Sequence, residues 1–485
     1  MKLKDIINEI DLIDISGELN VGINNICYDS RNVKEGDLFV CVKGFKVDGH
    51  KYVDSAMKKG AKAFIVEDEV KIDGVTVVKV SNSRKAMAKI ASNFYGDPTR
   101  SMEVIGITGT NGKTTITYLI NSILDSKNIK SGIIGTIGHK ILNKEYKANN
   151  TTPEAFELQK MFNEMKNAGV HVAVMEVSSH SIELDRVDNV NFSIGIFTNL
   201  TKDHLDYHKD MDNYYEAKKK LFFMTNKANI INVDDSYGKK LAKELESSHV
   251  ETITYGIDSE CHIRGTNIGI TPQGATFTLV TPKYSGEINL NTPGKFSIYN
   301  GLAAASGAYV LGYSFEDIKR GLENNKGVSG RFEKVNNSKG YNVIVDYSHT
   351  PDSLENALIT AKEFTQGKII TVFGCGGDRD KTKRSIMGEI AGKLSNYVII
   401  TSDNPRSEEP NSILDHIEEG IEGTNCEYKK IVDRKEGIRE AIKRANKDDI
   451  VLIAGKGHET YQILGNETID FDDRLVAKAI IEGEM

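Results

Sequence analysis

The stretch MEVIGITGTNGKTTITYLI, residues 102–120, decides the fold of this chain. It begins as a short strand rich in β-branched residues, passes through a glycine-containing turn, and continues into a helical stretch from Thr114 to about Lys127. Glycines let successive backbone N–H groups converge on phosphate oxygens, and a helix N-terminus adds the positive end of its dipole. The stretch therefore predicts a strand–loop–helix unit that binds the phosphates of a nucleotide.

The loop of this unit, GTNGKTT, supplies the side chains that a nucleoside triphosphate needs. We expect Lys113 to neutralise the β- and γ-phosphates and the Thr114 hydroxyl to suit Mg²⁺ coordination. The fit to GxxxxGK[ST] is incomplete because Ile107 occupies the first glycine position, and a tight βα turn without a ligand is the alternative. The predicted phosphate-binding residues are Gly109, Thr110, Asn111, Gly112, Lys113, Thr114 and Thr115.

The βα pattern continues after this unit. Apolar strands are expected at 170–177, 192–197 and 228–233, with helix-compatible segments between them, which indicates a mainly parallel sheet. Residues 252–291 have short strands, glycine turns and alternating residues, and they predict an antiparallel appendage. The βα pattern restarts near Gly330.

The first hundred residues mix short strands and helices, and the turn Gly96–Pro98 marks a boundary. We therefore predict an α/β fold of three domains that meet at a cleft. They are a small N-terminal α/β domain (1–98), a central P-loop-type ATPase domain with a parallel sheet (99–329) and a C-terminal Rossmann-like domain (330–485).

The composition excludes several classes of protein. With 39% hydrophobic and 27% charged residues among 485, the chain is not disordered, and a net charge of −7 argues against coating nucleic acid. The five cysteines are scattered without a CxxC pair, which argues against a disulfide scaffold and favours a reducing cytosol. We expect no signal peptide in MKLKDIINEIDLID, because charges interrupt it every few residues, and no membrane span, because no apolar run approaches about 20 residues. We expect a cytoplasmic protein with no membrane or nucleic-acid partner.

Two strand ends offer ligands for a metal ion. Glu176 closes the strand in VHVAVMEVSSH, and Asp203 and His204 lie in NLTKDHLDYH just after another strand. Because the carboxyl ends of parallel strands share one edge with the phosphate loop, these side chains can face the nucleotide. Glu176 and His204 would then hold Mg²⁺. The alternatives are a carboxylate that caps a helix and a hydrogen-bonded loop histidine.

Lys218 stands out within the three lysines of YYEAKKKLF. Helical spacing places it with Tyr214, Leu221 and Phe222 on a partly apolar side, unlike Lys219 and Lys220. The spacing alone assigns it no function.

Two later loops are rich in glycine and arginine, GCGGDRDKTKR (374–384) and SDNPRSEEP (402–410). Arg379 and Arg406 would lie at strand ends, where a guanidinium can bind a carboxylate with two hydrogen bonds. Solvated loop arginines are the alternative. The GxGG after a strand is only part of a dinucleotide-binding motif.

Taken together, these segments resemble the Mur ligase family, the ATP-dependent amino-acid ligases of peptidoglycan precursor synthesis. The resemblance is collinear over nearly the whole chain. It includes YDSRNVKEGDLFVCVKG, GTNGKTT, NNTTP, MEVSSHSIELDRV, NLTKDHLDYH, YYEAKKKLF, PGKFSIYN, SGRFEKV, VDYSHTPDSL, FGCGGDRDKTKR, DNPR and AGKGHE. The DNPR segment is similar to that of members that use meso-2,6-diaminopimelate instead of L-lysine.

The resemblance implies ATP and Mg²⁺ as cofactors and a set of site residues. It implies catalytic roles for Lys113, His204 and Lys218, with Lys218 carbamylated, and metal binding by Thr114, Glu176, His204 and the Lys218 carbamate. Asn300, Arg331 and Asp346 match positions around the nucleotide. Ser30, Asn150, Thr151, Thr152, Ser178 and Arg186 match residues that hold the UDP-muramoyl-dipeptide substrate. Arg379, Asp403, Asn404, Pro405, Arg406, Gly455 and Glu459 match the diaminopimelate pocket.

Two positions depart from the family pattern. Leu184 stands where some members have a glutamine that contacts the muramoyl substrate, so we expect no such contact here. Ser385 replaces a proline that is common after the Lys-Arg pair, which affects only the start of the following helix.

The implied reaction couples ATP to amide-bond formation between small molecules, through an acyl phosphate on the γ-carboxylate of D-glutamate. It needs no protein nucleophile, and we expect the enzyme to act as a monomer. The alternatives are a lysine-adding muramyl ligase, a ligase like folylpolyglutamate synthetase, a P-loop ATPase or GTPase that acts as a switch or motor, and a dinucleotide-dependent dehydrogenase.

Overall fold

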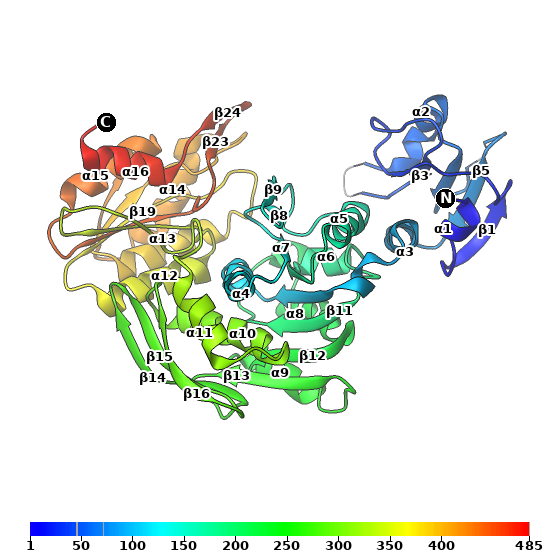
Figure 1. Ribbon diagram of the computed structural model, residues 1–485. Helices are drawn as coiled ribbons and strands as arrows, with labels where there is room; N and C mark the ends of the chain where they lie inside the picture. The colour runs from blue at the N-terminus through cyan, green and yellow to red at the C-terminus, as the bar shows by residue number, and fades with distance from the viewer. Residues whose placement is uncertain (45–46, 71, 485) are drawn as a thin grey trace.

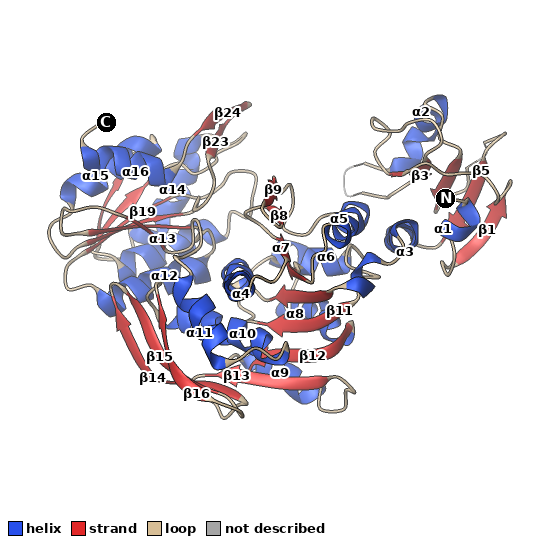
Figure 2. Cartoon of the chain, viewed as in Figure 1, coloured by secondary structure: helices blue, strands red, loops and turns tan. Residues whose placement is uncertain are grey.

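The computed structural model describes residues 1–44, 47–70 and 72–484, without the side chain of residue 206. Within these residues the strands form sheets of five, eleven and six strands and one two-stranded hairpin (Figure 1). The three larger sheets follow one another along the chain, and helices pack against the two larger ones on both faces (Figure 2).

The N-terminal sheet has the strand order β1-β5-β4-β3-β2. β2 to β5 are parallel, and β1 is antiparallel to β5. Helix α3 links this sheet to the rest of the chain. It begins after Asn82, whose side chain accepts hydrogen bonds from two backbone N–H groups of the first turn, and ends at Gly96 in the left-handed conformation. The elements are α1 (Leu3–Ile6), β1 (Leu12–Ser16), β2 (Ile26–Cys27), β3 (Leu38–Val40), α2 (Val53–Lys58), β4 (Ala63–Val66), β5 (Thr76–Val80) and α3 (Ser83–Tyr95).

The central sheet has the order β16-β15-β14-β13-β12-β11-β6-β10-β7-β8-β9. Its middle strands are parallel, and in the sheet they lie in the order β13, β12, β11, β6, β10 and β7. Because β10 and β11 flank β6 on either side, their carboxyl ends lie at the same edge as the phosphate loop. The strands are β6 (Glu103–Thr108), β7 (Ser131–Ile134), β8 (His139–Ile141), β9 (Lys144–Tyr146), β10 (Val172–Glu176), β11 (Phe192–Phe197), β12 (Thr225–Asn232), β13 (Glu251–Gly256), β14 (Ile263–Thr271), β15 (Gly274–Val280) and β16 (Ser285–Leu290).

Helices of the central region follow the strands that they cover. The strands are buried on both faces by aliphatic side chains, as expected for a parallel sheet between two helix layers. The helices are α4 (Lys113–Ser126), α5 (Ala155–Asn167), α6 (Ser179–Glu183), α7 (Leu205–His208), α8 (Met211–Lys219), α9 (Ser236–Glu244), α10 (Lys295–Val310) and α11 (Phe315–Asn324).

The expected antiparallel appendage at 252–291 is only partly correct. β13 pairs parallel with β12, while β14, β15 and β16 form an antiparallel meander. The meander stays hydrogen-bonded to β13, so it extends the central sheet instead of forming a separate unit. The difference follows from the connections, because β13 comes after the crossover helix α9, whereas short turns join β14 to β15 and β15 to β16.

The C-terminal sheet has the order β17-β18-β22-β19-β20-β21, parallel except for β17. The carboxyl ends of β18, β22, β19 and β20 therefore share one edge. The elements are β17 (Glu333–Val335), β18 (Asn342–Asp346), α12 (Pro351–Phe364), β19 (Ile369–Phe373), α13 (Lys383–Leu394), β20 (Tyr397–Ile400), α14 (Pro410–Ile421), β21 (Glu427–Lys430), α15 (Arg434–Arg444), β22 (Ile450–Ala454), β23 (Tyr461–Leu464), β24 (Glu467–Asp470) and α16 (Asp473–Glu482).

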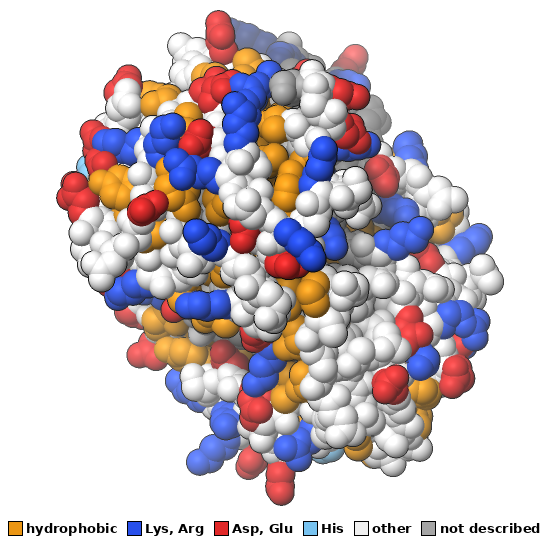
Figure 3. All heavy atoms as spheres, turned by 90° about the vertical axis from the view of Figure 1, so that its left-hand side faces the viewer, with side chains coloured by type: hydrophobic (Ala, Val, Ile, Leu, Met, Phe, Trp, Pro, Cys, Tyr) orange, Lys and Arg blue, Asp and Glu red, His pale blue; other side chains and the backbone are white. Residues whose placement is uncertain are grey.

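The surface is mixed in charge. On the face that Figure 3 shows, acidic and basic side chains are interspersed and hydrophobic side chains lie between them. Among the described residues, no helix is both long enough and apolar enough to cross a membrane.

Candidate active site

The phosphate loop joins β6 to α4, and two of its positions require glycine. Gly109 and Gly112 have φ angles of 148° and 88°, which side chains rarely adopt. A Cβ atom on Gly109 would lie 1.8 Å from the Thr198 hydroxyl oxygen, and one on Gly112 would lie 2.5 Å from the Asn300 side-chain oxygen. The loop is therefore packed directly against β11 and α10.

The residues after β11 fix the shape of this loop. The Asn111 N–H donates to Asn199 Oδ1 at 2.9 Å, and the Thr198 hydroxyl donates to the Asn111 carbonyl at 2.6 Å. The Thr110 N–H donates to the Asn199 carbonyl at 2.9 Å. The protein itself thus holds the loop in shape, as preorganised anion binding requires.

Two lysine side chains converge on one carbonyl of the loop. Lys113 Nζ donates to the Gly109 and Thr110 carbonyls at 2.9 and 2.8 Å, and Lys218 Nζ donates to the Gly109 carbonyl at 2.9 Å. The expected contrast among the α8 lysines is confirmed. Lys218 is buried, whereas the side chains of Lys219 and Lys220 are 21% and 56% exposed.

Burial acts on the pKa of both lysine amines. Loss of hydration lowers the pKa of Lys113. Loss of hydration, followed by the nearby charge of Lys113, lowers the pKa of Lys218 well below its usual value. The Lys218 amine lies 4.5 Å from the centre of the Tyr214 ring. The arrangement favours a neutral, nucleophilic amine at Lys218.

Glu176 lies at the end of β10 among hydroxyl groups. Its Oε2 accepts hydrogen bonds from the hydroxyls of Thr114 at 2.9 Å and Thr136 at 3.0 Å, and its Oε1 accepts one from the Thr136 N–H at 2.8 Å. The Arg331 guanidinium donates to the Thr114 hydroxyl at 3.1 Å. A buried carboxylate beside a threonine hydroxyl at the first turn of α4 is the hard oxygen donor set that suits Mg²⁺.

His204 comes after β11, makes no described hydrogen bond to Glu176, and has a side chain that is 44% exposed. Its ring Nε2 is 3.3 Å from Asp203 Oδ2. Desolvation lowers the pKa of His204 to about 4, and the charges of Lys113 and Lys218 act in the same direction. The imidazole is therefore neutral at pH 7 and has a lone pair for a cation.

Most residues expected at the muramoyl substrate gather beside Glu176. The Thr152 hydroxyl donates to the Glu176 carbonyl at 2.9 Å, and Arg186 donates to the Thr152 carbonyl at 3.1 Å and pairs with Glu154 at 2.7 Å. The hydroxyls of Thr151 and Thr136 are 3.0 Å apart.

Ser178 belongs to the same group, because its N–H donates to the Thr152 hydroxyl at 3.2 Å while its own hydroxyl caps α6 by accepting from the Ser181 N–H. Two further residues of this set have other surroundings. Asn150 is exposed. Ser30 lies in the N-terminal domain, where its carbonyl accepts a hydrogen bond from Lys59.

Asp346 closes β18 and faces the chain segment after Gly330. Its Oδ2 accepts a hydrogen bond from the Phe332 N–H at 2.6 Å, and burial raises the pKa of its carboxyl. A small hollow beside α4 is lined by Thr115, Leu119, Leu290, Asn291, Thr292, Phe296, Ser297, Leu322, Asn325, Gly327, Val328 and Arg331.

The loops after β19 and β20 interlock through Arg406. Its guanidinium donates to the Gly377 carbonyl at 2.8 Å and to the Asn404 carbonyl at 3.4 Å. A Cβ atom on Gly376 would lie 2.9 Å from Arg406 Nη1, so a larger residue there would require the guanidinium to shift. Arg379 donates to the carbonyl of the preceding residue at 3.0 Å.

The loop after β22 meets the same group. Asn404 Nδ2 donates to Glu459 Oε2 at 2.9 Å, and Asn404 Oδ1 accepts from the Ile463 N–H at 3.0 Å. Gly455 has φ 116°, and a Cβ atom there would lie 2.7 Å from Asp403 Oδ2. The backbone of Pro405 packs on Gly377. The predicted amino-acid pocket is thus assembled from three strand ends.

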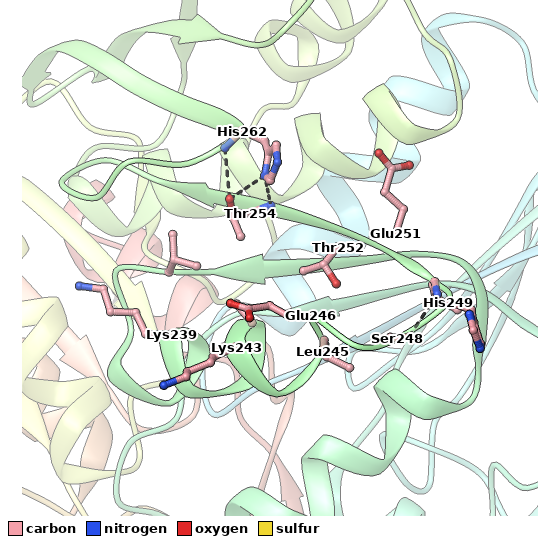
Figure 4. A pocket seen from close by; sticks show the side chains of 13 residues that line it. Lys239, Lys243, Leu245, Glu246, Ser248, His249, Glu251, Thr252, Thr254 and His262 are labelled. Atoms are coloured by element: carbon pink, nitrogen blue, oxygen red, sulfur yellow. Dashed lines mark hydrogen bonds between the residues drawn. The ribbon is translucent and has the colours of Figure 1, made fainter.

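Two other features lie apart from these residues. A hollow of about 590 Å³ lies against α9 and β13 and contains none of the predicted site residues. Figure 4 shows its side chains spread along the two elements and not directed at one point. Asp48, His50 and Asp68 also form a cluster, but both His50 ring nitrogens already have hydrogen-bond partners.

Comparison with known proteins accounts for this arrangement. Family models match residues 22–95 (Mur ligase family, catalytic domain), 107–308 (Mur ligase middle domain) and 330–457 (Mur ligase, glutamate ligase domain). The UDP-N-acetylmuramoyl-L-alanyl-D-glutamate–2,6-diaminopimelate ligase of Clostridioides difficile (strain 630) is 53% identical over 98% of this chain and 99% of its own. The chain belongs to the Mur ligase family.

Further relatives support this membership. The ligase of the same name from Alkaliphilus oremlandii is 50% identical over 100% of this chain and 99% of its own. A solved structure of a ligase with this name is 30% identical, covers 100% of this chain and 99% of its own, and has a TM-score of 0.73. A Thermotoga maritima MurF ligase in complex with ADP shares the fold at 20% identity, 95% and 99% coverage and a TM-score of 0.67.

In this Mur ligase, sequence reasoning missed residues that shape the site. Thr136, Thr198 and Asn199 hold Glu176 and the phosphate loop, and Tyr214 lies between Thr110 and Lys218. Thr136 follows β7 and Thr198 follows β11, so the shared edge of the parallel strands was the signal that could have identified them.

Proposed function

We propose that this Mur ligase joins meso-2,6-diaminopimelate to the D-glutamate γ-carboxylate of UDP-N-acetylmuramoyl-L-alanyl-D-glutamate, with ATP as the phosphoryl donor. The observation that supports this best is the pairing of a lysine-lined phosphate loop with a separate pocket of arginine and carboxylate groups at the DNPR loop. The names of relatives at 50–53% identity over nearly the whole chain support the same activity.

The chemistry explains why the site is made mostly of charged groups. A carboxylate is a poor electrophile, so the γ-carboxylate first takes the terminal phosphoryl group of ATP and becomes an acyl phosphate. The neutral amine of diaminopimelate then attacks the acyl carbon, and the tetrahedral intermediate expels phosphate to leave the amide. Lys113 and Arg331, which contact the phosphate loop and the first turn of α4, would neutralise the charge that builds up on the phosphate oxygens.

Thr114, Glu176, His204 and the Lys218 carbamate would hold Mg²⁺ in this scheme. When bound, the ion neutralises phosphate charge and aligns the phosphoryl group for transfer. The neutral Lys218 amine adds CO₂ and releases a proton, so that a carbamate anion, and not an amine that could become protonated, lies beside Lys113. The change removes the repulsion between the two lysines and supplies an oxygen ligand.

Amino-acid recognition is assigned to the C-terminal loops. Arg406 and Arg379 are suited to the carboxylates of diaminopimelate, and Glu459 and Asp403 to its ammonium groups. The Arg406 guanidinium donates hydrogen bonds to two backbone carbonyls, and a substrate carboxylate would take the place of these acceptors. L-Lysine lacks the second carboxylate and would leave one guanidinium without an anion.

A phosphate-release assay tests the assignment. Purified protein with ATP and Mg²⁺ is mixed with the UDP-muramoyl dipeptide and, one at a time, diaminopimelate, L-lysine and other amino acids. We expect phosphate release only when dipeptide and diaminopimelate are both present, together with the amide product by mass spectrometry. Release that is independent of the dipeptide would favour a switch or motor ATPase, and equal use of lysine would refute the amino-acid assignment.

We also propose that the enzyme works on small molecules as a monomer in the cytoplasm. Its five cysteines are all free thiols in the structure, in keeping with a reducing compartment. Light scattering on the purified protein at micromolar concentration should give the mass of one chain.

A further inference from the structure

Lys456 is a fully buried cation beneath the pocket of the DNPR loop. It follows β22, between Gly455 and Gly457, and its side chain has no exposed surface. A charged group is buried in this way only where other groups compensate the lost hydration. Its partners therefore indicate what it does.

Both described hydrogen bonds of Lys456 Nζ go to residues of the predicted amino-acid pocket. It donates to Glu459 Oε2 at 2.9 Å and to Asn404 Oδ1 at 3.2 Å. Asn404 Nδ2 donates to the same Glu459 oxygen at 2.9 Å. The three side chains form a closed triangle, and both donors reach Oε2 of the carboxylate and not Oε1.

Another buried basic residue of this region, Arg434, has different contacts. Arg434 pairs with Asp473, and neither side chain has exposed surface. Its remaining hydrogen bonds go to the backbone carbonyls of Ser402 and Ala454. Arg434 therefore ties together the ends of β20 and β22, whereas Lys456 acts on the side chains that would face the amino acid.

We propose that Lys456 is a positioning residue for amino-acid recognition, which holds the Glu459 carboxylate turned so that Oε1 receives the ammonium group of the substrate. The inference rests on the proposed function. Because Lys456 and Asn404 both donate hydrogen bonds to Oε2, the Glu459 carboxylate is held in one orientation. By donating to Asn404 Oδ1, Lys456 also fixes which way round the amide lies, so that its NH₂ group faces Glu459.

The test is a double-mutant cycle on the full-length enzyme. Lys456→Met keeps the length of the side chain and removes its charge, and Glu459→Gln removes the charge of its partner. For each single variant and the double variant, kcat and the KM values for diaminopimelate, ATP and the UDP-muramoyl dipeptide are measured, with thermal unfolding as a check on folding. Lys478→Met, at an exposed lysine of α16, is the matched control.

We expect Lys456→Met to raise the KM for diaminopimelate at least about tenfold, as expected for loss of a hydrogen bond to a charged group. The other two KM values should change less than about threefold. In the Glu459→Gln background the same substitution should add less than about twofold, because a positioning residue acts only through its partner.

Three results would overturn the inference. They are an unchanged KM for diaminopimelate in Lys456→Met, a similar rise in all three KM values together with a lower Tm, and effects of the two substitutions that multiply. If Lys456→Met does not fold, the KM for diaminopimelate is compared between Glu459→Gln and the double variant, which has no unpaired buried charge. Equal KM values then support the inference, and a further tenfold rise refutes it.

The proposed function fails in a distinguishable way. If the unmodified protein ligates no amino acid to the dipeptide, the proposed function falls and this inference falls with it. If the unmodified enzyme uses diaminopimelate and Lys456→Met does so with the same KM, only the inference is lost.

Discussion

The phosphate loop and the DNPR pocket both gather charged side chains at the carboxyl ends of parallel strands, but they balance these charges differently. At the phosphate loop, Lys113 and Lys218 donate to the same carbonyl, and the pKa of each amine is lowered. At the pocket, Lys456 pairs with Glu459, and Arg406 is held by backbone carbonyls. The first site brings together two amines whose charged forms are disfavoured by burial, and the second site is internally paired.

The difference teaches how each site is expected to select its ligand. A site of desolvated basic groups gains most when an anion arrives, because the ligand compensates the hydration that their charged forms lost on burial. A paired site gains little from charge alone and selects by the fixed directions of its hydrogen bonds. We therefore expect substitutions at the phosphate loop to affect the rate of the reaction and substitutions at the pocket to affect the choice of amino acid.

The largest effect is expected from Lys113→Ala. Removing the charge that faces the terminal phosphates should lower kcat at least about 10³-fold, while the fold stays intact because the loop is held by Thr198 and Asn199. Phosphate release and thermal unfolding measure the two properties. Near-normal turnover in a folded variant would contradict the assignment of the loop to ATP.

Lys218→Ala should lower turnover by about 10²–10³-fold, with partial recovery when short carboxylic acids are added. In the unmodified enzyme the pKa of Lys218 is lowered, so the amine is neutral above that pKa and becomes protonated as pH falls through it. Activity should therefore decline on the acid side and at low bicarbonate. Lys220→Ala, at an exposed lysine, is the control, and full activity of Lys218→Ala would exclude the carbamate.

Arg406→Ala should raise the KM for diaminopimelate about 10²-fold, because a paired guanidinium–carboxylate contact contributes about 2–4 kcal/mol when partly desolvated. The KM values for ATP and for the muramoyl dipeptide should change much less. Steady-state kinetics with each substrate varied in turn measures this. A uniform loss in all parameters would mean that Arg406 only supports the loop.

Gly376→Ala tests the same contact from the other side. The added methyl group would lie 2.9 Å from Arg406 Nη1, so the guanidinium must move by a few tenths of an ångström. We expect the KM for diaminopimelate to rise about tenfold with kcat nearly unchanged. Gly423→Ala, where a Cβ atom has only one neighbour at 3.9 Å, is the matched control, and equal effects of the two would refute the idea.

The smallest effect is a gain in stability from Lys218→Met. Below the usual pKa of lysine the unfolded chain binds a proton that the folded chain, with its lowered pKa, does not bind until the pH is lower. This lysine therefore destabilises the fold at neutral pH, and its removal should raise the free energy of unfolding by about 1 kcal/mol. Urea unfolding at pH 7 and pH 10 should show the gain shrinking at the higher pH.

Much of the fold could be predicted from the sequence because the signals are local. The strand, glycine loop and helix at 102–126 follow from β-branched residues, glycines and helical periodicity, and β11 has the predicted bounds Phe192–Phe197. The error at 252–291 has a physical cause, since parallel and antiparallel strands can have the same alternation of side chains. β13 pairs parallel with β12 because the crossover helix α9 connects the two strands. No short pattern within β13 itself reveals that connection.

The sequence by itself determined the chemistry that is available to this protein. The loop GTNGKTT, the strand-end Glu176, the lysine of YYEAKKKLF and the DNPR loop name the charged groups, because their residue types fix which atoms can bind phosphate, cations and carboxylates. Only the tertiary structure decided how these charges are balanced. Lys218 meets the loop across 109 residues of sequence and Lys456 meets Asn404 across 52, and burial, which sets protonation and pairing, exists only once those distant segments pack together.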